Sequence, residues 1–172
     1  MFDLLMTRRS IRKYKRKAIE TKKIDTIIQA ALTSPSGKNK RPWELVLVDN
    51  KDILNQLGLS RGPASSFIAD ASVAIVVLAD PNLSDTWVED SSIISTVIQL
   101  TSHSLGIGSC WVQVRNRVRE DGASVESYIK KLLKVPDNLS VLSIIAMGYP
   151  KETKKPHDEN SLSQDKIHYN KY

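Results

Sequence analysis

The most basic stretch of the chain lies near its start, where Thr7 to Lys17 contain seven cationic residues and no acid. Within it, the segment Arg8-Arg9-Ser10-Ile11-Arg12 offers guanidinium groups and a hydroxyl within a few residues. Guanidinium groups bind phosphate oxygens in pairs, and a hydroxyl suits a polyhydroxyl chain. The segment is therefore a candidate site for a phosphate-bearing ligand, and a solvated basic arm remains the simpler alternative.

A second polar segment runs from Pro35 to Trp43 and reads Pro-Ser-Gly-Lys-Asn-Lys-Arg-Pro-Trp. It packs turn-forming and small polar residues between an expected helix and an expected strand. Composition alone favours an ordinary helix-to-strand loop. Its value as a candidate binding segment comes from its combination with the basic arm.

Several familiar catalytic and binding motifs are absent. The pair Gly106 and Gly108 follows an expected helix, and Trp111 stands where a dinucleotide fingerprint has its third glycine. No nucleophile elbow or P-loop occurs. The three histidines are too widely spaced for a metal site. Cys110 has no neighbour in sequence that would lower its pKa, so we expect an inert buried thiol. The chemistry is therefore expected to come from a bound cofactor.

The elements expected to position these segments alternate between helices and strands. Apolar residues recur at helical spacing from Ile24 to Ala31, with Thr21 as a plausible N-cap. Residues 43–48 are rich in strand formers, and a short helix is expected around residues 53–57. Residues 72–79 are apolar on both faces, which predicts a strand in the middle of a covered sheet.

The second half of the chain is expected to begin with a long central helix over residues 87–105, which carries a wide apolar stripe and is capped by Gly106. A short strand at 111–114, a helix up to Pro136 and a last strand at 141–147 follow. The remaining residues, 149–172, form a polar tail with Ile167, Tyr169 and Tyr172 near its end. We expect this tail to wrap a second subunit.

The bulk properties fit one soluble domain over residues 1–172, since 41% of the residues are hydrophobic and 26% are charged. A single cysteine excludes an internal disulfide, and no signal peptide is recognised, so we expect a cytoplasmic protein. The longest apolar run is far shorter than a membrane span, so no membrane partner is expected. The net charge of +6 raises nucleic acid as a partner, but the basic arm has only Tyr14 as an interleaved aromatic residue, so none is expected.

Taken together, five motifs resemble the nitroreductase family over nearly the whole chain. They are the Arg-Arg-Ser-Ile-Arg start, the Pro35 to Trp43 loop, the run Trp87-Val88-Glu89-Asp90, the segment Leu105 to Trp111, and Gly148-Tyr149-Pro150 with an Ile167-His168-Tyr169 tail. The resemblance implies an α+β fold, a three-layer α/β/α sandwich with a central, mostly antiparallel sheet. It also implies a homodimer in which the C-terminal segment of one subunit adds a strand to the sheet of the other.

The resemblance further implies a cofactor, FMN, with NADH or NADPH as electron donor and a small oxidised organic acceptor such as a nitroaromatic or a quinone. Arg8, Arg9, Ser10 and Arg12 would hold the FMN phosphate and ribityl chain. Pro35, Ser36, Gly37 and Asn39 would approach the flavin from the partner subunit. Trp111, Val112, Gln113 and Val114 would line the ring, with a backbone N–H directed at the flavin N5. Lys154 and Lys155 match a further phosphate contact, and no metal is expected.

The resemblance leaves some points open at this stage. His157 replaces an arginine that is common in the family at the position after the phosphate contact, and Arg41 stands where many members have glutamine. The donor and acceptor would use the same space in turn, in a ping-pong order. The alternative is a flavin-binding or sequestering protein with little turnover, which would use the same pocket as a receptor.

Overall fold

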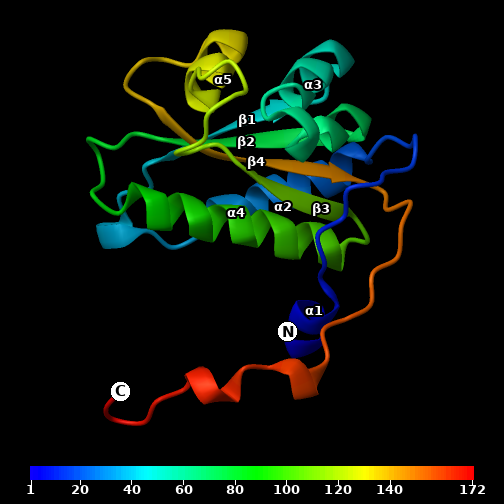
Figure 1. Ribbon diagram of the computed structural model, residues 1–172, viewed down its shortest axis with the longest axis vertical. Helices are drawn as coiled ribbons and strands as arrows, with labels where there is room; N and C mark the ends of the chain where they lie inside the picture. The colour runs from blue at the N-terminus through cyan, green and yellow to red at the C-terminus, as the bar shows by residue number, and fades with distance from the viewer.

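The computed structural model describes all 172 residues and is built around a four-stranded antiparallel sheet with strand order β1-β2-β4-β3 (Figure 1). The strands are β1 (Trp43–Val48), β2 (Val73–Ala79), β3 (Gly108–Gln113) and β4 (Ser140–Gly148). Every residue of β2 is buried, because this central strand is covered on both faces. The prediction of a buried strand over residues 72–79 is therefore confirmed to within one residue.

Helices cover the sheet on both faces and complete a three-layer sandwich (Figure 1). On one face lie α2 (Thr21–Leu32) and α4 (Trp87–Ser104), and on the other lie α3 (Lys51–Gly58) and α5 (Val125–Leu133). Successive side chains of a strand point to opposite faces, so Ile75 and Val77 join one hydrophobic cluster while Ala74 and Val76 join the other. The expected α+β sandwich is confirmed.

The long helix α4 has two apolar lines where the sequence predicted one wide stripe. Ile94 and Ile98 are fully buried against the sheet, while Ile93 on the outward side is 39% exposed. Serines share the buried side, and the Ser95 hydroxyl lies 3.2 Å from the Ser143 hydroxyl of β4. Small side chains let the helix approach the sheet closely, whereas Ile93, Val97 and Leu100 form a second apolar line that is only partly buried.

Two boundaries differ from those predicted. Strand β3 begins at Gly108, three residues earlier than expected, because Gly108 and Ser109 have little strand propensity but pair with Gly148 and Met147 of β4. Thr21 is the first residue of α2 and not its N-cap, and the capping position Glu20 makes no side-chain capping bond. The expected turn after α4 is confirmed, since Gly106 has φ +75°.

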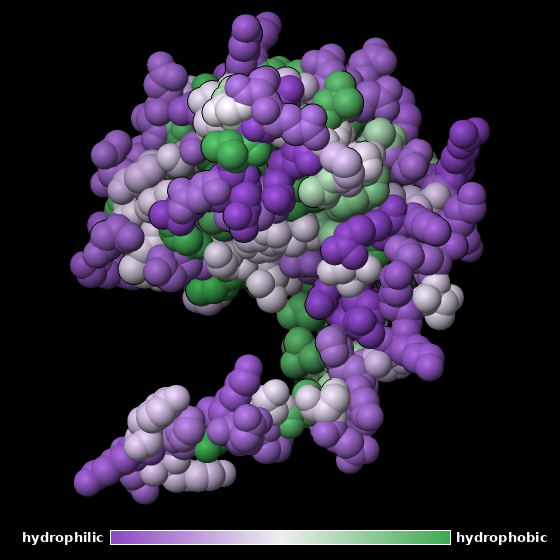
Figure 2. All heavy atoms as spheres, viewed as in Figure 1, coloured by the Kyte–Doolittle hydropathy of each residue, from purple (hydrophilic) through white to green (hydrophobic).

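The N-terminal helix and the C-terminal tail both lie outside the sandwich, on the same side of it (Figure 1). The short helix α1 (Phe2–Thr7) buries none of its residues, and every residue from 153 to 172 is exposed. The tail contains only single turns at Glu159–Ser161 and Gln164–Lys166, and it forms no strand with its own sheet. Figure 2 shows hydrophobic residues where α1 lies between the body and the tail. No helix is both long and apolar enough to cross a bilayer.

Candidate functional site

The basic arm lies on the edge strand β3. Ser10 forms a parallel bridge with Ser109, and the Ile11 N–H donates to the Ser109 carbonyl at 3.0 Å. These contacts fix the backbone on either side of Ser10. The arm is therefore a built part of the sheet edge, and the alternative of a freely solvated segment does not hold for Ser10 and Ile11.

Two glycines that pair across β3 and β4 allow the arm to pack directly against the sheet. Gly108 of β3 pairs with Gly148 of β4, and both lie beneath side chains of the arm. A Cβ on Gly108 would lie 2.9 Å from Ile11, and a Cβ on Gly148 would lie 2.8 Å from Tyr14. Any larger residue at either position would lift the arm from the sheet.

Tyr14 fixes the C-terminal part of the arm on the sheet, where its ring packs on Gly148. Its ring is 5% exposed, and its hydroxyl lies within hydrogen-bond distance of the carbonyls of Ile11, at 2.7 Å, and Ala146, at 3.1 Å. Burial raises the pKa of Tyr14 well above its usual value. The hydroxyl therefore stays protonated and ties the arm to strand β4.

The beginning of the C-terminal tail runs antiparallel beside the arm. The Lys151 N–H donates to the Lys13 carbonyl at 2.8 Å, and the His157 N–H donates to the Met6 carbonyl at 2.8 Å. Between these points the Arg9 guanidinium donates to the Lys155 carbonyl. The predicted phosphate contacts from the arm and from the tail are thereby brought together at one place: Arg8, Arg9, Ser10, Arg12, Lys154 and Lys155.

Glu152 organises this cationic cluster, and sequence reasoning missed it. One carboxylate oxygen accepts the backbone N–H of Arg12 at 2.6 Å and that of Lys13 at 3.1 Å. The other oxygen lies 3.0 Å from Lys154 Nζ. The hydrogen bond from Arg12, followed by the contact with Lys154, holds the pKa of Glu152 below its usual value. The carboxylate fixes the arm backbone and leaves the Arg12 side chain free.

The predicted ring-lining segment occupies the free edge of the sheet. Val112 and Val114 bury their side chains in the core, and the Val114 N–H donates to the Leu142 carbonyl of β4, so neither valine offers a side chain to a ligand. Trp111 and Gln113 are half-buried, and the Trp111 indole donates to Gln113 Oε1 at 2.9 Å. Hydrogen-bonding directions alternate along an antiparallel strand, so the N–H groups of Trp111 and Gln113 share the free edge with Ser109.

The Cys110 side chain lies on the opposite face of β3 from the side chains of Trp111 and Gln113, and it is 1% exposed. Burial raises the pKa of its thiol, although the charge of Arg12 and a hydrogen bond with Ser10 act in the other direction. A thiol with a raised pKa is a poor nucleophile. The structure therefore agrees with the prediction of an unreactive cysteine.

The second predicted segment is a tight loop at the beginning of α4. The Gly37 N–H donates to Asp90 Oδ1 at 2.8 Å, and a Cβ on Gly37 would lie 2.4 Å from Thr86 Oγ1. Three non-glycine residues of this loop have left-handed backbone angles: Lys38 at φ 52°, Asn39 at 54° and Arg41 at 47°. Strained backbone of this kind persists only where surrounding contacts determine it, and it concentrates at binding sites.

Asp90 holds this loop; the sequence marked it only as part of the run Trp87-Val88-Glu89-Asp90 and gave it no role. It is 2% exposed, and its other oxygen accepts the hydroxyls of Ser84 at 3.0 Å and Thr86 at 3.2 Å. A buried acid on a core-facing helix surface was the available signal, because acids are rarely buried without partners. Its partners here are an N–H and two hydroxyls.

We expect Asp90→Ala to destabilise the protein by about 2 kcal/mol, because it leaves the Gly37 N–H and the buried Ser84 hydroxyl without an acceptor. Asp90→Asn keeps one acceptor oxygen and should cost less than about 1 kcal/mol. Urea unfolding of both variants, with the exposed Asp25→Ala as control, checks this. Equal stability of Asp90→Ala and Asp25→Ala would contradict the anchoring role.

The arm and the loop lie at opposite ends of α4 within one chain. The loop contacts Asp90 in the first turns of the helix, whereas Thr7 Oγ1 contacts His103 Nε2 in its last turn at 2.9 Å. Thirteen residues of helix at 1.5 Å each separate the two contacts by about 20 Å. The structure therefore brings the arm, the tail and β3 together, but it does not bring Pro35, Ser36, Gly37 and Asn39 to them within one chain.

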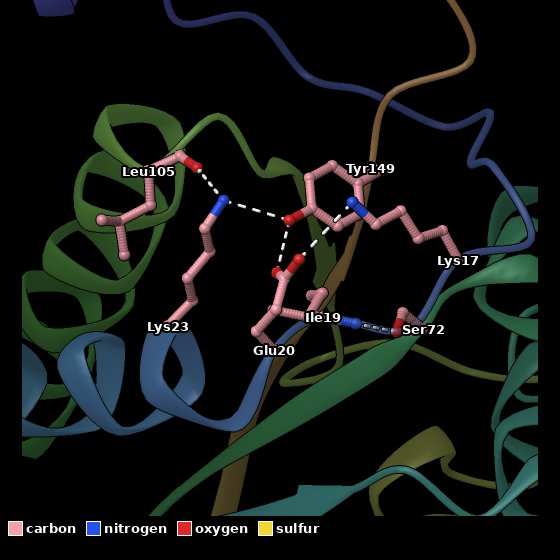
Figure 3. Close-up of polar contacts among 7 residues, drawn as sticks. All are labelled: Lys17, Ile19, Glu20, Lys23, Ser72, Leu105 and Tyr149. Atoms are coloured by element: carbon pink, nitrogen blue, oxygen red, sulfur yellow. Dashed lines mark hydrogen bonds and ion pairs between the residues drawn. The ribbon is translucent and has the colours of Figure 1, made fainter.

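Tyr149 lies where the arm and the tail leave the sandwich, and it contacts Lys17, Glu20 and Lys23 (Figure 3). Its hydroxyl is 3.0 Å from Lys23 Nζ and also contacts the Glu20 carboxylate. Lys17 Nζ lies 4.1 Å from the centre of its ring. The cluster joins α2 to the chain segments on either side of the site.

The hydrogen bond from Tyr149 lowers the pKa of Glu20 to about 2. A depressed folded-state pKa contributes stability above the unfolded value, near 4.3, and this contribution is lost as the pH falls from there toward 2. We expect Glu20→Gln to lose less stability than the native chain between pH 6 and pH 3. Urea unfolding at both values checks this, with Asp25→Asn as the matched control. An unchanged acid sensitivity would contradict the Tyr149 contact.

Comparison with known proteins places this arrangement in a family. The model of the nitroreductase family matches residues 5–61 and 59–149. An FMN-dependent nitroreductase from Clostridium difficile R20291 is 44% identical and superposes with a TM-score of 0.98 over 100% of both chains. A provisionally named NADH dehydrogenase/NAD(P)H nitroreductase of Archaeoglobus fulgidus is 35% identical over 98% of this chain and 97% of its own length. The chain belongs to the nitroreductase family.

Proposed function

We propose that this chain is an FMN-dependent oxidoreductase that passes electrons from NADH or NADPH to a small oxidised organic acceptor. The observation that carries the proposal is the convergence of the arginine-rich arm, the tail lysines and the open edge of β3 in one place. Similarity to an FMN-dependent nitroreductase over the full chain supports the same assignment. The single cysteine suits a reducing compartment, so we infer a cytoplasmic enzyme with residues 1–172 as one FMN-binding domain.

The groups at the site fit the parts of FMN. Arg8 and Arg12 supply cations for its phosphate, Lys154 adds a cation that also pairs with Glu152, and Ser10 supplies a hydroxyl for its ribityl chain. Arg9 already donates to the Lys155 carbonyl, so its main part is to hold the tail. The same contact holds the backbone of Lys155 next to the arm, and we infer that its side chain makes a further contact with the phosphate.

The edge of β3 fits the flavin ring. The N–H groups of Trp111 and Gln113 lie on the free edge, and a donor of this kind can be directed at the flavin N5 without any special side chain. Val112 and Val114 keep the strand rigid by burying their side chains. Bound FMN supplies the chemistry, since its ring accepts a hydride and gives up electrons. The protein positions donor and acceptor in turn at the same place, in a ping-pong order.

A homodimer completes this site. The loop from Pro35 to Asn39 lies about 20 Å along α4 from the arm, so a two-fold axis beside this helix would bring each loop to the other subunit's arm. The outward Ile93 on α4 and the exposed Phe2 and Leu5 on α1 supply apolar surface for such an interface. The tail, which forms no strand with its own sheet, is free to add one to the partner's sheet.

The cofactor and the activity can be tested separately. We expect the purified protein to be yellow and to release FMN on heating, because no dinucleotide fingerprint exists for the adenylate half of FAD. A colourless protein that takes up no added FMN would contradict the proposal. Steady-state oxidation of NADH and NADPH with a quinone or a nitroaromatic then tests turnover, and negligible oxidation with FMN bound would favour a flavin-sequestering protein.

A further inference from the structure

A basic groove lies beside the cofactor site and shares no residue with it. It has a volume of about 1430 Å³, and its cationic lining residues are Lys13, Lys15, Arg16, Lys17, Lys51 and Lys151. Asp70 is its only acid. The groove therefore has a surplus of five positive charges, against a surplus of six for the whole chain. Cations gathered in a concave surface focus their field into it.

Most of these cations have no partner in the protein. Lys17 pairs with Glu20, and Lys51 Nζ donates to the Ala69 carbonyl. The side chains of Lys13, Lys15, Arg16 and Lys151 form neither an ion pair nor a hydrogen bond, whereas the cation of Lys154 is already paired with Glu152. Four free charges thus face one groove without being neutralised.

The backbone that carries these cations is fixed. Lys15 N–H donates to the Tyr149 carbonyl, Lys17 N–H to the Lys15 carbonyl and Lys151 N–H to the Lys13 carbonyl, each at 2.8 Å. Tyr14 is buried beneath them, and the Ile19 N–H donates to the Ser72 hydroxyl at 3.1 Å. Because the segment is held at several points, a ligand would meet positioned charges and would not have to order a loose arm.

We propose that this groove binds a chain of phosphate groups, recognised through their charges alone. The volume exceeds the range of about 300–1,000 Å³ that suits one small ligand, which favours an extended occupant. Tyr14, the only aromatic residue of the lining, is 5% exposed, so no ring is available for stacking bases. The other apolar lining residues are Ala18 and Ala71, too small to hold an apolar peptide or to enter a lipid layer.

Binding of long-chain inorganic polyphosphate to the FMN-loaded protein tests the proposal. The groove variant Lys15→Ala/Lys151→Ala is compared with Lys22→Ala/Lys131→Ala, which removes the same charge from exposed positions elsewhere. We expect fluorescence anisotropy of labelled polyphosphate at about 50 mM salt to show roughly tenfold weaker binding for the groove variant and little change for the control. The slope of log K against log salt should fall by about 1.4, as for two phosphate contacts.

Two further probes distinguish the source of the phosphates. A single-stranded oligonucleotide that binds with the same groove dependence would identify a nucleic-acid backbone as the source, and polyphosphate alone would identify the inorganic chain. Equal weakening by both double variants, no measurable binding, or equally tight binding of poly-glutamate would overturn the proposal. FMN absorbance, measured in each sample, should not differ between the variants.

Discussion

A chain cut after His157 should be monomeric and should bind FMN at least about a hundredfold more weakly than the full chain. The cut keeps the hydrogen bond between His157 and Met6, and it keeps Lys154 and Lys155 beside the arm. It removes Leu162, Ile167 and Tyr169, whose apolar surfaces are exposed in the single chain. Because no residue from 158 onward is buried, the sandwich itself should remain folded.

The size of this effect follows from the proposed dimer. Obligate interfaces of this kind commonly exceed about 2,000 Å², and a tail of fifteen residues supplies a large part of such an area. Without the partner, the FMN would lose every contact from the Pro35 to Asn39 loop. Two lost hydrogen bonds to a charged or polar ligand, at about 1.5 kcal/mol each, already amount to roughly a hundredfold.

Light scattering and FMN titration of the cut chain check this prediction. The variant Lys166→Ala/Lys171→Ala serves as control, because it changes the charge of the tail and keeps its apolar residues. A cut chain that remains dimeric would show that the tail does not hold the subunits together. A monomer that binds FMN as tightly as the full chain would show that the site is complete within one subunit.

The sequence predicts those parts of the fold in which local pattern and burial agree. Residues 43–48 and 73–79 are β-branched or apolar at nearly every position, and both strands are found within one residue of the prediction. The start of β3 was missed because Gly108 and Ser109 favour no strand by themselves. Their pairing with β4 comes from the whole sheet, and no local window contains it.

In the candidate site, too, the features that depend on local residue types were predicted and those that depend on packing were not. Arg8 to Arg12 and the Pro35 to Asn39 loop were found as motifs, because their residue types suggest ligand contacts. Their separation along α4 depends on how the helix packs and is not visible in the sequence. The roles of Asp90 and Glu152 were not predicted because an acid normally lies on the surface. Only the structure shows each one accepting hydrogen bonds from the backbone of the loop or of the arm.

Arg12→Ala should weaken FMN binding by roughly tenfold to a hundredfold without unfolding the protein. Glu152 accepts the Arg12 backbone N–H, so the guanidinium is left free to form charge-assisted hydrogen bonds with the phosphate. Each such bond contributes about 1.5–3 kcal/mol, and 1.4 kcal/mol corresponds to a factor of ten. The Arg12 guanidinium lies 5.8 Å from the centre of the half-buried Phe67 ring, and because the arginine is exposed this contact contributes only about 0.5–1 kcal/mol.

Lys15→Ala is the matched control for Arg12→Ala. Lys15 carries the same charge in the same arm, its side chain has no partner in the protein, and it faces the basic groove instead of the cofactor site. Fluorescence titration of the apoprotein with FMN should therefore separate the two variants by about a factor of ten or more. If both weaken FMN equally and slightly, the arm acts on the cofactor only as a diffuse positive charge, and the assignment of the phosphate to Arg12 is wrong.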